Sequence, residues 1–330
     1  MSMREIIEAA AVGGDGLIPA AGLRAIGIES HGAQALVSRE ELVRIRRGMY
    51  VPGSHWRSIR PAERYRLFVR ATATLARRPA VVSHMSAAAL HRLPTIGEWP
   101  ATVHMIDTDA TGGSHGGLIT RHRHVDADGF TSIDGLAVTS LPRTLVDVAC
   151  SCSFLVAVTM IDHALRVERE RVESEARRGF LGSPQLTKED LYAELALVNP
   201  RRGAKRAAHA IGFADGLSAN PGETLSRVQI FQLGFEVPEL QVRFMVSGHE
   251  YWVDFFWRSI RKIGEFDGKH KYTRGAVLGD RDPGEVIWEE KRREDALRRH
   301  SNSFTRWDWE TAISPRRFHD FLVEQGVPRA

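Results

Sequence analysis

The sequence predicts a multidomain protein of mixed α+β and α/β class, and three observations lead to that prediction. The chain of 330 residues is long enough for two or three domains. Helix-like segments and alternating strand-like segments follow one another along its length. The hydrophobic fraction of 43% and the charged fraction of 26% are typical of folded globular proteins. We therefore expect several folded domains with their own cores.

The overall charge permits nucleic-acid binding without requiring it, because the net charge is +4 and the chain is basic. The first residues lack the apolar core of a signal peptide. No run approaches the roughly 18 apolar residues of a membrane span. We expect a cytoplasmic protein without a membrane partner. Cys150 and Cys152 are too close for an easy disulfide and too few for structural zinc, so reduced thiols are predicted.

The first 53 residues predict a winged helix-turn-helix domain. Helices are expected at residues 3–12, 19–26 and 31–38, separated by glycine turns. The basic run RIRRGMYVPG after them predicts the hairpin of a wing. The last helix would enter the major groove and the wing would contact phosphates. A protein-docking module built from the same elements is the alternative.

The predicted DNA contacts come from that helix and its flanks. Ser30 is expected at the N-cap, and His31 and Gln34 are expected to contact base edges or phosphates. The basic residues beyond the helix, which are expected to contact the DNA backbone, are Arg39, Arg44, Arg46 and Arg47.

This segment resembles the N-terminal domain of the AbiEi family, the antitoxins of type IV toxin–antitoxin systems. The matching positions are Gly16, Leu23, Gly27, Leu36, Arg44, Gly48 and Tyr50. The resemblance implies a DNA-binding autoregulator with a cognate toxin as a further partner. It extends to about residue 180 through the strings SHMSAAALHRLP and TSLPRTLVDVA. It implies no catalytic residues there.

Residues 54–180 predict a mixed α/β middle domain. Helices are expected at 61–76 and 81–94, the second capped near Ser83 and ended by Pro94. Three strands are expected at 101–107, 116–124 and 136–140, and a further helix from Pro142. His84 and His91 share a helix face, but without a suitably spaced carboxylate or cysteine we expect packing or capping. Residues 181–214 predict a helical linker. Its basic patch, expected to contact phosphate, consists of Arg201, Arg202, Lys205 and Arg206.

The C-terminal segment, residues 215–330, carries the predicted chemistry. An aromatic run around Asp254 and a second run holding Glu265 and Asp267 predict two strands of a hairpin. Paired through residues 258–261, they would set Asp254 opposite Glu265, with Asp267 on the same face. Carboxylates that face one another repel, so we expect a cation held by hard oxygen ligands such as Mg²⁺, Mn²⁺ or Ca²⁺. Solvent-facing acids on an edge hairpin are the alternative.

These acids, with Glu223 on a preceding helix, resemble the Vsr-like branch of the PD-(D/E)XK nucleases. The resemblance implies a restriction-endonuclease-like α/β core in the order helix, three strands, helix, strand, helix. It implies Mg²⁺ or Mn²⁺ bound by Glu223, Asp254 and Glu265. Asp267 stands where the more familiar motif has the catalytic lysine, so Lys269, Lys271 and Lys291 are the candidates for that role. Without the resemblance, Glu223 would simply complement the dipole of its helix.

Two functions follow as expectations. The first is a DNA-binding protein whose C-terminal domain hydrolyses DNA phosphodiester bonds with a bound metal. The second is a non-catalytic AbiEi-like antitoxin and transcriptional repressor with a nuclease-derived domain. Neither the recognised DNA nor the oligomeric state follows from the residues.

Overall fold

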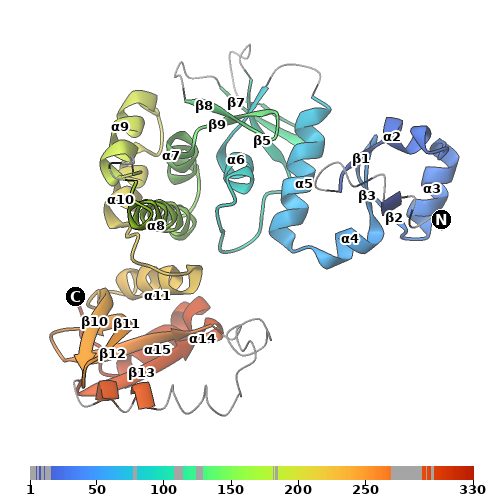
Figure 1. Ribbon diagram of the computed structural model, residues 1–330. Coiled ribbons are helices and arrows are strands. Elements are labelled where there is room, and N and C mark those ends of the chain that lie inside the picture. Colours follow the sequence, from blue (N-terminus) through green and yellow to red (C-terminus); the bar gives the residue numbers. More distant parts are fainter. Residues whose placement is uncertain are drawn as a thin grey trace. The chain divides into compact units, whose positions relative to one another are not determined.

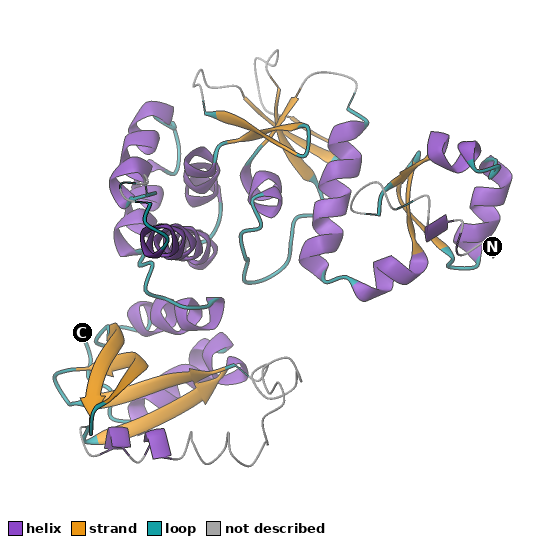
Figure 2. Cartoon of the chain, viewed as in Figure 1, coloured by secondary structure: helices purple, strands orange, loops and turns teal. Residues whose placement is uncertain are grey.

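The computed structural model shows a multidomain α+β protein (Figures 1 and 2). It describes residues 16–76, 80–107, 114–123, 129–180, 185–268 and 301–330, together with residues 5, 7, 8, 11, 182, 292–294 and 296–298. The chain divides into two compact units, which are described separately. Unit 1 comprises residues 1–152 and 189–208, and unit 2 comprises residues 153–188 and 209–330. No helix in the described ranges is long and apolar enough to cross a membrane.

The two units are coarser than the four expected domains. Residues 1–152 fall in unit 1, and residues 153–180 fall in unit 2. The expected linker at 181–214 is split between the two units.

Unit 1 begins with helices followed by a basic hairpin, in the order the sequence predicts. Its first elements are β1 (Ile18–Pro19), α2 (Ala20–Ala25), α3 (Ser30–Ser38), β2 (Leu42–Arg46), β3 (Met49–Pro52) and α4 (Gly53–Ser58). The strands form a small sheet in the order β1-β3-β2. Apolar residues of both helices pack on it, with Leu23, Leu36 and Leu42 fully or nearly buried. The predicted helix at 3–12 lies mostly outside the described residues.

The rest of unit 1 is a six-stranded mixed sheet with helices. Its elements are α5 (Pro61–Thr74), β4 (Ala80–Val82), α6 (His84–Leu90), β5 (Val103–Asp107), β6 (Ser114–Gly116), β7 (Ile119–Arg123), β8 (Phe130–Ile133), β9 (Leu136–Thr139), α7 (Leu141–Ser151), α9 (Lys188–Val198) and α10 (Ala204–Phe213), of which α10 continues into unit 2. The strand order is β6-β7-β5-β4-β9-β8. The predicted helices and the three predicted strands are confirmed. The cap expected near Ser83 is confirmed, because Ser83 is the N-cap of α6. Val81 and Val82, which the predicted helix included, instead form β4, and these β-branched residues pair with β5 and β9.

Unit 2 holds a four-stranded sheet with helices. Its elements are α8 (Phe154–Arg177), α11 (Pro221–Gln232), β10 (Glu239–Val246), β11 (His249–Trp257), β12 (Lys262–Asp267), β13 (Ser303–Asp308), α14 (Trp309–Ile313) and α15 (Pro315–Glu324). The strands lie in the order β10-β11-β12-β13, antiparallel except for the parallel pair β12–β13. Residues 292–294 and 296–298 are helical, so the described elements follow the predicted order of helices and strands, with α14 as an additional short helix.

The core of unit 2 brings α11 very close to the sheet. Phe255, Trp307 and Phe318 stack or tilt against one another with ring centroids 5.2 to 5.5 Å apart. A Cβ on Gly222 of α11 would lie 2.1 Å from the ring of Phe266 in β12. Only glycine allows this approach, which places the first turn of α11 beside the sheet.

Candidate functional site

Four adjacent strands of unit 2 each contribute one residue to a polar row across the sheet. The β11–β12 register runs through Phe255 opposite Gly264, so the next position sets Asp254 opposite Glu265, as predicted. In the same way Gln241 of β10 falls opposite Asp254, and Arg306 of β13 pairs directly with Glu265. The row therefore reads Gln241, Asp254, Glu265, Arg306 on one sheet face.

Glu223 contributes a carboxylate to this site from the first turn of α11. Asn220 caps α11 by accepting hydrogen bonds from the backbone N–H groups of Gly222 and Glu223, at 2.9 and 3.1 Å. The Glu223 carboxylate in turn accepts from the backbone N–H of Ala219 at 2.7 Å and from the Asn220 amide at 2.6 Å. Glu223 is 3% exposed. The helix-terminus role that the sequence allowed for Glu223 is therefore present, and it fixes the carboxylate in place.

Gln241 joins Glu223 to Asp254. Its amide Nε2 lies 3.2 Å from Glu223 Oε2 and 3.4 Å from Asp254 Oδ1, within hydrogen-bond reach of both. Gln241 has a φ of 46°, in the left-handed region that side chains other than glycine rarely adopt. Strained backbone of this kind persists where the surroundings enforce it, and it is common at functional sites. Gln241 was not among the predicted site residues, although extending the strand register to β10 places it opposite Asp254.

Asp254 is oriented by the neighbouring strand. Its Oδ2 accepts a hydrogen bond from the backbone N–H of Phe266 at 3.0 Å. Its Oδ1 therefore points to the Gln241 side, where Glu223 also lies. Two carboxylates from separate elements, a helix start and a strand, are brought to one amide group.

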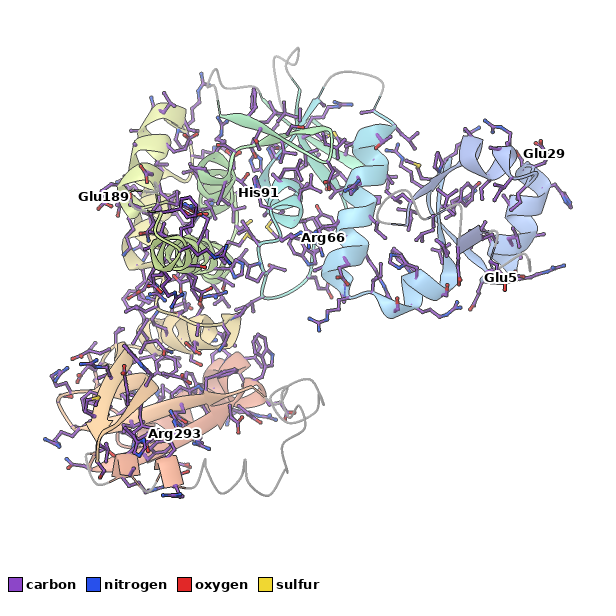
Figure 3. The ribbon with its side chains drawn as sticks, viewed as in Figure 1. Glu5, Glu29, Arg66, His91, Glu189 and Arg293 are labelled. Atoms are coloured by element: carbon purple, nitrogen blue, oxygen red, sulfur yellow. The ribbon has the colours of Figure 1, made fainter. Side chains whose placement is uncertain are left out.

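Glu265 is held by two arginines. Arg293 Nη2 donates to Glu265 Oε1 at 2.6 Å and to the carbonyl oxygen of Trp252 at 2.6 Å, and Figure 3 labels Arg293 beside the sheet. Arg306 Nη2 donates to Glu265 Oε2 at 3.0 Å. Burial raises the pKa of the Glu265 carboxyl above its ordinary value, while Arg293 and Arg306 oppose that shift. Both carboxylate oxygens are thus engaged.

Four predicted catalytic residues remain, and the structure describes Asp267 among them. Asp267 is half-buried, lies two residues after Glu265 on the same strand face, and pairs in register with Asp308. Lys269, Lys271 and Lys291 lie outside the described residues.

The carboxylates of this site differ in how well they suit a hard divalent ion such as Mg²⁺. Mg²⁺ is commonly bound by one or two carboxylates with water completing its shell, and Glu223 with Asp254 fits that requirement. The Glu265 oxygens accept from two charged guanidinium groups, whereas the oxygens of Glu223 and Asp254 accept from neutral amide and backbone N–H groups. Glu265 therefore suits such an ion less well than that pair. Among the described residues, no group of three or more histidine, cysteine, aspartate or glutamate side chains is arranged to hold a metal.

The predicted DNA contacts of the N-terminal elements are mostly on the surface. Ser30, His31 and Gln34 are exposed on α3, but the N-cap is Glu29, so the cap predicted at Ser30 is wrong: the helix begins one residue earlier. Arg39, Arg44 and Arg47 are exposed as well. Arg46 is half-buried and donates from Nη1 to the carbonyl oxygen of Thr72 at 3.3 Å, so it ties β2 to α5.

The basic patch near residue 200 is also exposed. Arg201 and Arg202 precede α10, and Lys205 and Arg206 lie in its first turn. Arg206 also donates to the carbonyl oxygen of Cys150. Cys150 and Cys152 are free thiols, and burial raises the pKa of Cys150 to about 11.

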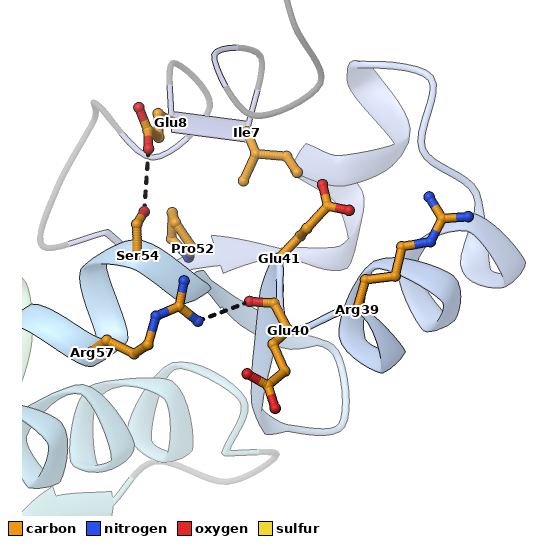
Figure 4. Close-up of a pocket in the computed structure, with 8 residues that line it drawn as sticks. All are labelled: Ile7, Glu8, Arg39, Glu40, Glu41, Pro52, Ser54 and Arg57. Atoms are coloured by element: carbon orange, nitrogen blue, oxygen red, sulfur yellow. Dashed lines mark hydrogen bonds between the residues drawn. The ribbon is translucent and has the colours of Figure 1, made fainter.

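A cavity of about 260 Å³ opens beside the N-terminal hairpin (Figure 4). It is lined by Ile7, Glu8, Arg39, Glu40, Glu41, Pro52, Ser54 and Arg57. Arg57 Nη1 donates to the carbonyl oxygen of Glu40 and Ser54 Oγ to Glu8 Oε1, each at 3.2 Å. These contacts fasten α4 to neighbouring segments, and we assign the cavity no ligand.

A buried polar cluster in unit 1 was not predicted. The ring of His84 stacks on that of His122 at 3.6 Å, and His122 Nε2 lies 3.0 Å from His104 Nδ1. His84 also lies 3.7 Å from Asp147 Oδ2, and Asp147 pairs with Arg143 at 3.1 Å. The expected packing role of His91 is confirmed by its 2.8 Å hydrogen bond to the Thr139 carbonyl oxygen. For His84 the carboxylate came from α7, sixty-three residues later, where spacing gives no signal.

The comparisons with known proteins give a limited result. No family model matches the chain. Two uncharacterized proteins of Mycobacterium tuberculosis, MT2308 of strain CDC 1551 / Oshkosh and Rv2248 of strain H37Rv, are each 28% identical over 183 residues. The match covers 55% of this chain and 60% of the length of each relative. The crystal structure of the RV2827C protein from the same species is 15% identical, with a TM-score of 0.35, over 67% of this chain and 78% of that one.

Proposed function

We propose that the protein binds DNA and that unit 2 hydrolyses phosphodiester bonds with a divalent cation, Mg²⁺ or Mn²⁺. One observation supports this most: Glu223 and Asp254, from a helix start and a strand, reach the same Gln241 amide. Such a pair of hard oxygen donors suits these ions. The resemblance of about residues 215–325 to Vsr-like PD-(D/E)XK domains points the same way.

Glu223 and Asp254 would hold the cation, and the residues around them would keep both carboxylates in place. The Asn220 amide, the Ala219 N–H and the Phe266 N–H each fix one of these oxygens. A bound cation would supply a water of lowered pKa and would neutralise charge on the phosphate. Asp267, on the same face, would lie beyond the pair as an outer polar group.

The test is a cleavage assay on supercoiled, linear and single-stranded DNA with Mg²⁺ or Mn²⁺. Asp254→Asn keeps the size of the side chain and should reduce cleavage about a hundredfold or more, because a catalytic metal contributes several kcal/mol. The matched control is Asp320→Asn on α15, where the side chain is 63% exposed and should not matter. Undiminished cleavage by Asp254→Asn would refute the assignment.

A second candidate function is an AbiEi-like repressor that binds its own promoter without cutting it, with a cognate toxin as partner. Three observations favour it. The carboxylate of Glu265 is engaged by two arginines, and Asp267 occupies the position at which the resemblance leads one to expect lysine. The N-terminal order of two helices and a hairpin, with His31 and Gln34 exposed on α3, suits DNA recognition.

A promoter-binding assay together with the cleavage assay separates the two functions. A repressor would shift its own promoter DNA in a salt-dependent way and would cleave no substrate under any metal condition. Saturated promoter binding together with metal-dependent cleavage would support the first proposal. A toxin partner would be tested by co-purification with the product of a neighbouring toxin-like gene.

A further inference from the structure

A small cavity of unit 2 lies between α8 and the start of α11, next to the residues that hold Glu223. Its volume is about 10 Å³, which is close to the space that one water molecule needs. The cavity therefore admits a single small ligand. Its lining consists of Thr159, His163 and Arg166 from α8 and of Ser218, Asn220, Pro221 and Thr224 from the segment around the start of α11.

Ser218 lines this cavity with a hydroxyl group that lacks a partner. The residue is 2% exposed, and its Oγ is buried and makes no hydrogen bond to any described residue. A buried hydroxyl in that state destabilises the fold, so a ligand that bonds to it would stabilise the segment. Ser218 therefore indicates that the cavity takes a ligand with hydrogen-bonding capacity.

Two threonines of the lining have already committed their hydroxyl hydrogens. Thr159 donates to the carbonyl oxygen of Leu155 at 2.7 Å, and Thr224 donates to Asp162 Oδ2 at 2.9 Å. Each threonine oxygen still has a lone pair. Toward a ligand in the cavity, both groups therefore act as acceptors.

His163 offers a donor to the same cavity. Its Nδ1 lies 3.3 Å from Arg166 Nη2, and because arginine only donates, Nδ1 accepts and the ring hydrogen lies on Nε2. Burial first, and then the charge of Arg166, lower the pKa of His163, so the ring is neutral. A cation would face the His163 N–H and Arg166, and an anion would face the two threonine acceptors. Water, which both donates and accepts, suits this lining best.

The segment that contains Ser218 also fixes both oxygens of the Glu223 carboxylate. Directly after Ser218, the backbone N–H of Ala219 donates to Oε2 at 2.7 Å and the Asn220 amide donates to Oε1 at 2.6 Å. A ligand that joins Ser218 to α8 would thus tie these two donors to a long helix. The position of Glu223 would then depend on the cavity.

We propose that the cavity binds one water molecule that links Ser218 to α8, and that Ser218 is through this water a positioning residue for Glu223. The water would accept from His163 and donate to a threonine oxygen, with Ser218 as a further partner. The role of Ser218 rests on the proposed function, in which Glu223 holds the cation. The water site itself does not rest on it.

The water is tested by a crystal structure of the full chain at a resolution that shows ordered solvent. The expected result is one peak within about 3 Å of Ser218 Oγ and of a polar atom on α8. A cavity without a peak, or one closed by a neighbouring side chain, would overturn the proposal.

The positioning role is tested by a Mn²⁺ titration of the DNA-free full chain, followed by electron paramagnetic resonance. Ser218→Ala and Thr159→Val should each lower the affinity about tenfold, the lower end for groups that orient metal ligands. The double variant should lose no more than either single variant, because both act through the same water. The matched control is Ser314→Ala, which removes the cap of α15 and should lower the melting temperature without changing the affinity.

The outcomes separate this inference from the proposed function. Wild-type affinity in Ser218→Ala, or additive losses in the double variant, would overturn the positioning role. A wild type that binds no Mn²⁺ would refute the proposed metal site and the role of Ser218 in it, while the crystal structure decides the water independently. Mn²⁺ binding with the expected losses but without DNA cleavage would support the positioning role and refute the proposed hydrolysis alone.

Discussion

Two arginine–carboxylate arrangements in unit 2 look alike in chemistry and differ in surroundings. Asp162 of α8 accepts from Arg227 at 2.7 Å, from the Thr224 hydroxyl at 2.9 Å and from the Asp215 N–H at 2.7 Å, and both charged side chains are at most 4% exposed. Among the described residues, the Glu265 carboxylate accepts hydrogen bonds from two arginines, and these side chains are about a quarter exposed.

The difference separates a fully buried ion pair from one that borders solvent. Arg227 Nη1 donates to the Phe213 carbonyl oxygen, and Arg227 Cζ lies 4.2 Å from the centre of the Phe213 ring, so the guanidinium group is surrounded by protein. A ligand has no way to reach it. Arg293 and Arg306 are equally well anchored but border solvent, so anchoring alone does not distinguish the two arrangements.

The largest expected effect is on the structural pair. Arg227→Met should lower the free energy of unfolding by about 3–5 kcal/mol, because it leaves the Asp162 carboxylate buried without its partner. Arg306→Met should cost about 1 kcal/mol or less, since the pair is partly solvated and Arg293 remains. Urea denaturation of the two variants measures the difference. Equal losses would contradict the distinction.

In unit 1, His84 and Asp147 form a further charged contact, whose contribution to stability depends on pH. His84 lies against Asp147, Arg143, His104 and His122, and burial, then His104 and Arg143, lower its pKa from 6.5 to about 3. Between these values the folded protein binds fewer protons than the unfolded chain, so stability is present above pH 6.5 and is lost as pH falls toward 3.

The variant His84→Asn tests this, because asparagine tolerates the left-handed φ of 52° at this position. Below pH 6.5, the wild-type free energy of unfolding should fall by up to about 1.4 kcal/mol per pH unit more steeply than that of His84→Asn. His319→Asn on α15 is the control and should follow the wild type. Parallel curves for the wild type and His84→Asn would show that His84 is not held neutral.

The position of Glu223 depends on the close approach of α11 to β12. Gly222→Ala should destabilise unit 2 by about 1–3 kcal/mol, because the new methyl group overlaps the Phe266 ring. Gly268→Ala is a matched control, since its Cβ would lie 3.8 Å from the same ring, in ordinary contact. Thermal unfolding compares them. Equal melting temperatures for the two variants would show that α11 does not pack tightly against β12.

The smallest effects are expected on DNA binding by the N-terminal elements, where Arg46 is hydrogen-bonded within the protein and Arg44 and Arg47 are exposed. Arg44→Gln and Arg47→Gln should each lower the salt slope of DNA binding by about 1. Arg46→Gln should leave the slope unchanged, because Arg46 is occupied by the Thr72 carbonyl oxygen. Equal slopes for all three variants would show that anchoring does not separate these arginines.

Much of the fold followed from local patterns in the chain. The hairpin register was predicted from the acidic and aromatic residues that alternate on either side of a short turn. These signals lie within a few residues of one another. The same locality explains the failure at Val81 and Val82, whose strand partners lie more than twenty residues away.

The candidate site was predicted only in part. Glu223, Asp254 and Glu265 were named, because acids stand out in apolar strands. Their partners were missed: Arg293 and Arg306 are two of many arginines in the sequence, and only the folded sheet shows which ones reach Glu265. Gln241 was missed because a glutamine in a strand is unremarkable until its neighbours across the ladder are known.

The most direct test of the central claim is a crystal structure of the protein with Mn²⁺, using the anomalous signal of the metal to locate it. The account predicts a single peak between the carboxylates of Glu223 and Asp254, with Gln241 displaced from them and Glu265 still bound by Arg293 and Arg306. A peak coordinated by Glu265, with the arginines released, would contradict it. So would crystals saturated with Mn²⁺ that show no peak at Glu223 and Asp254.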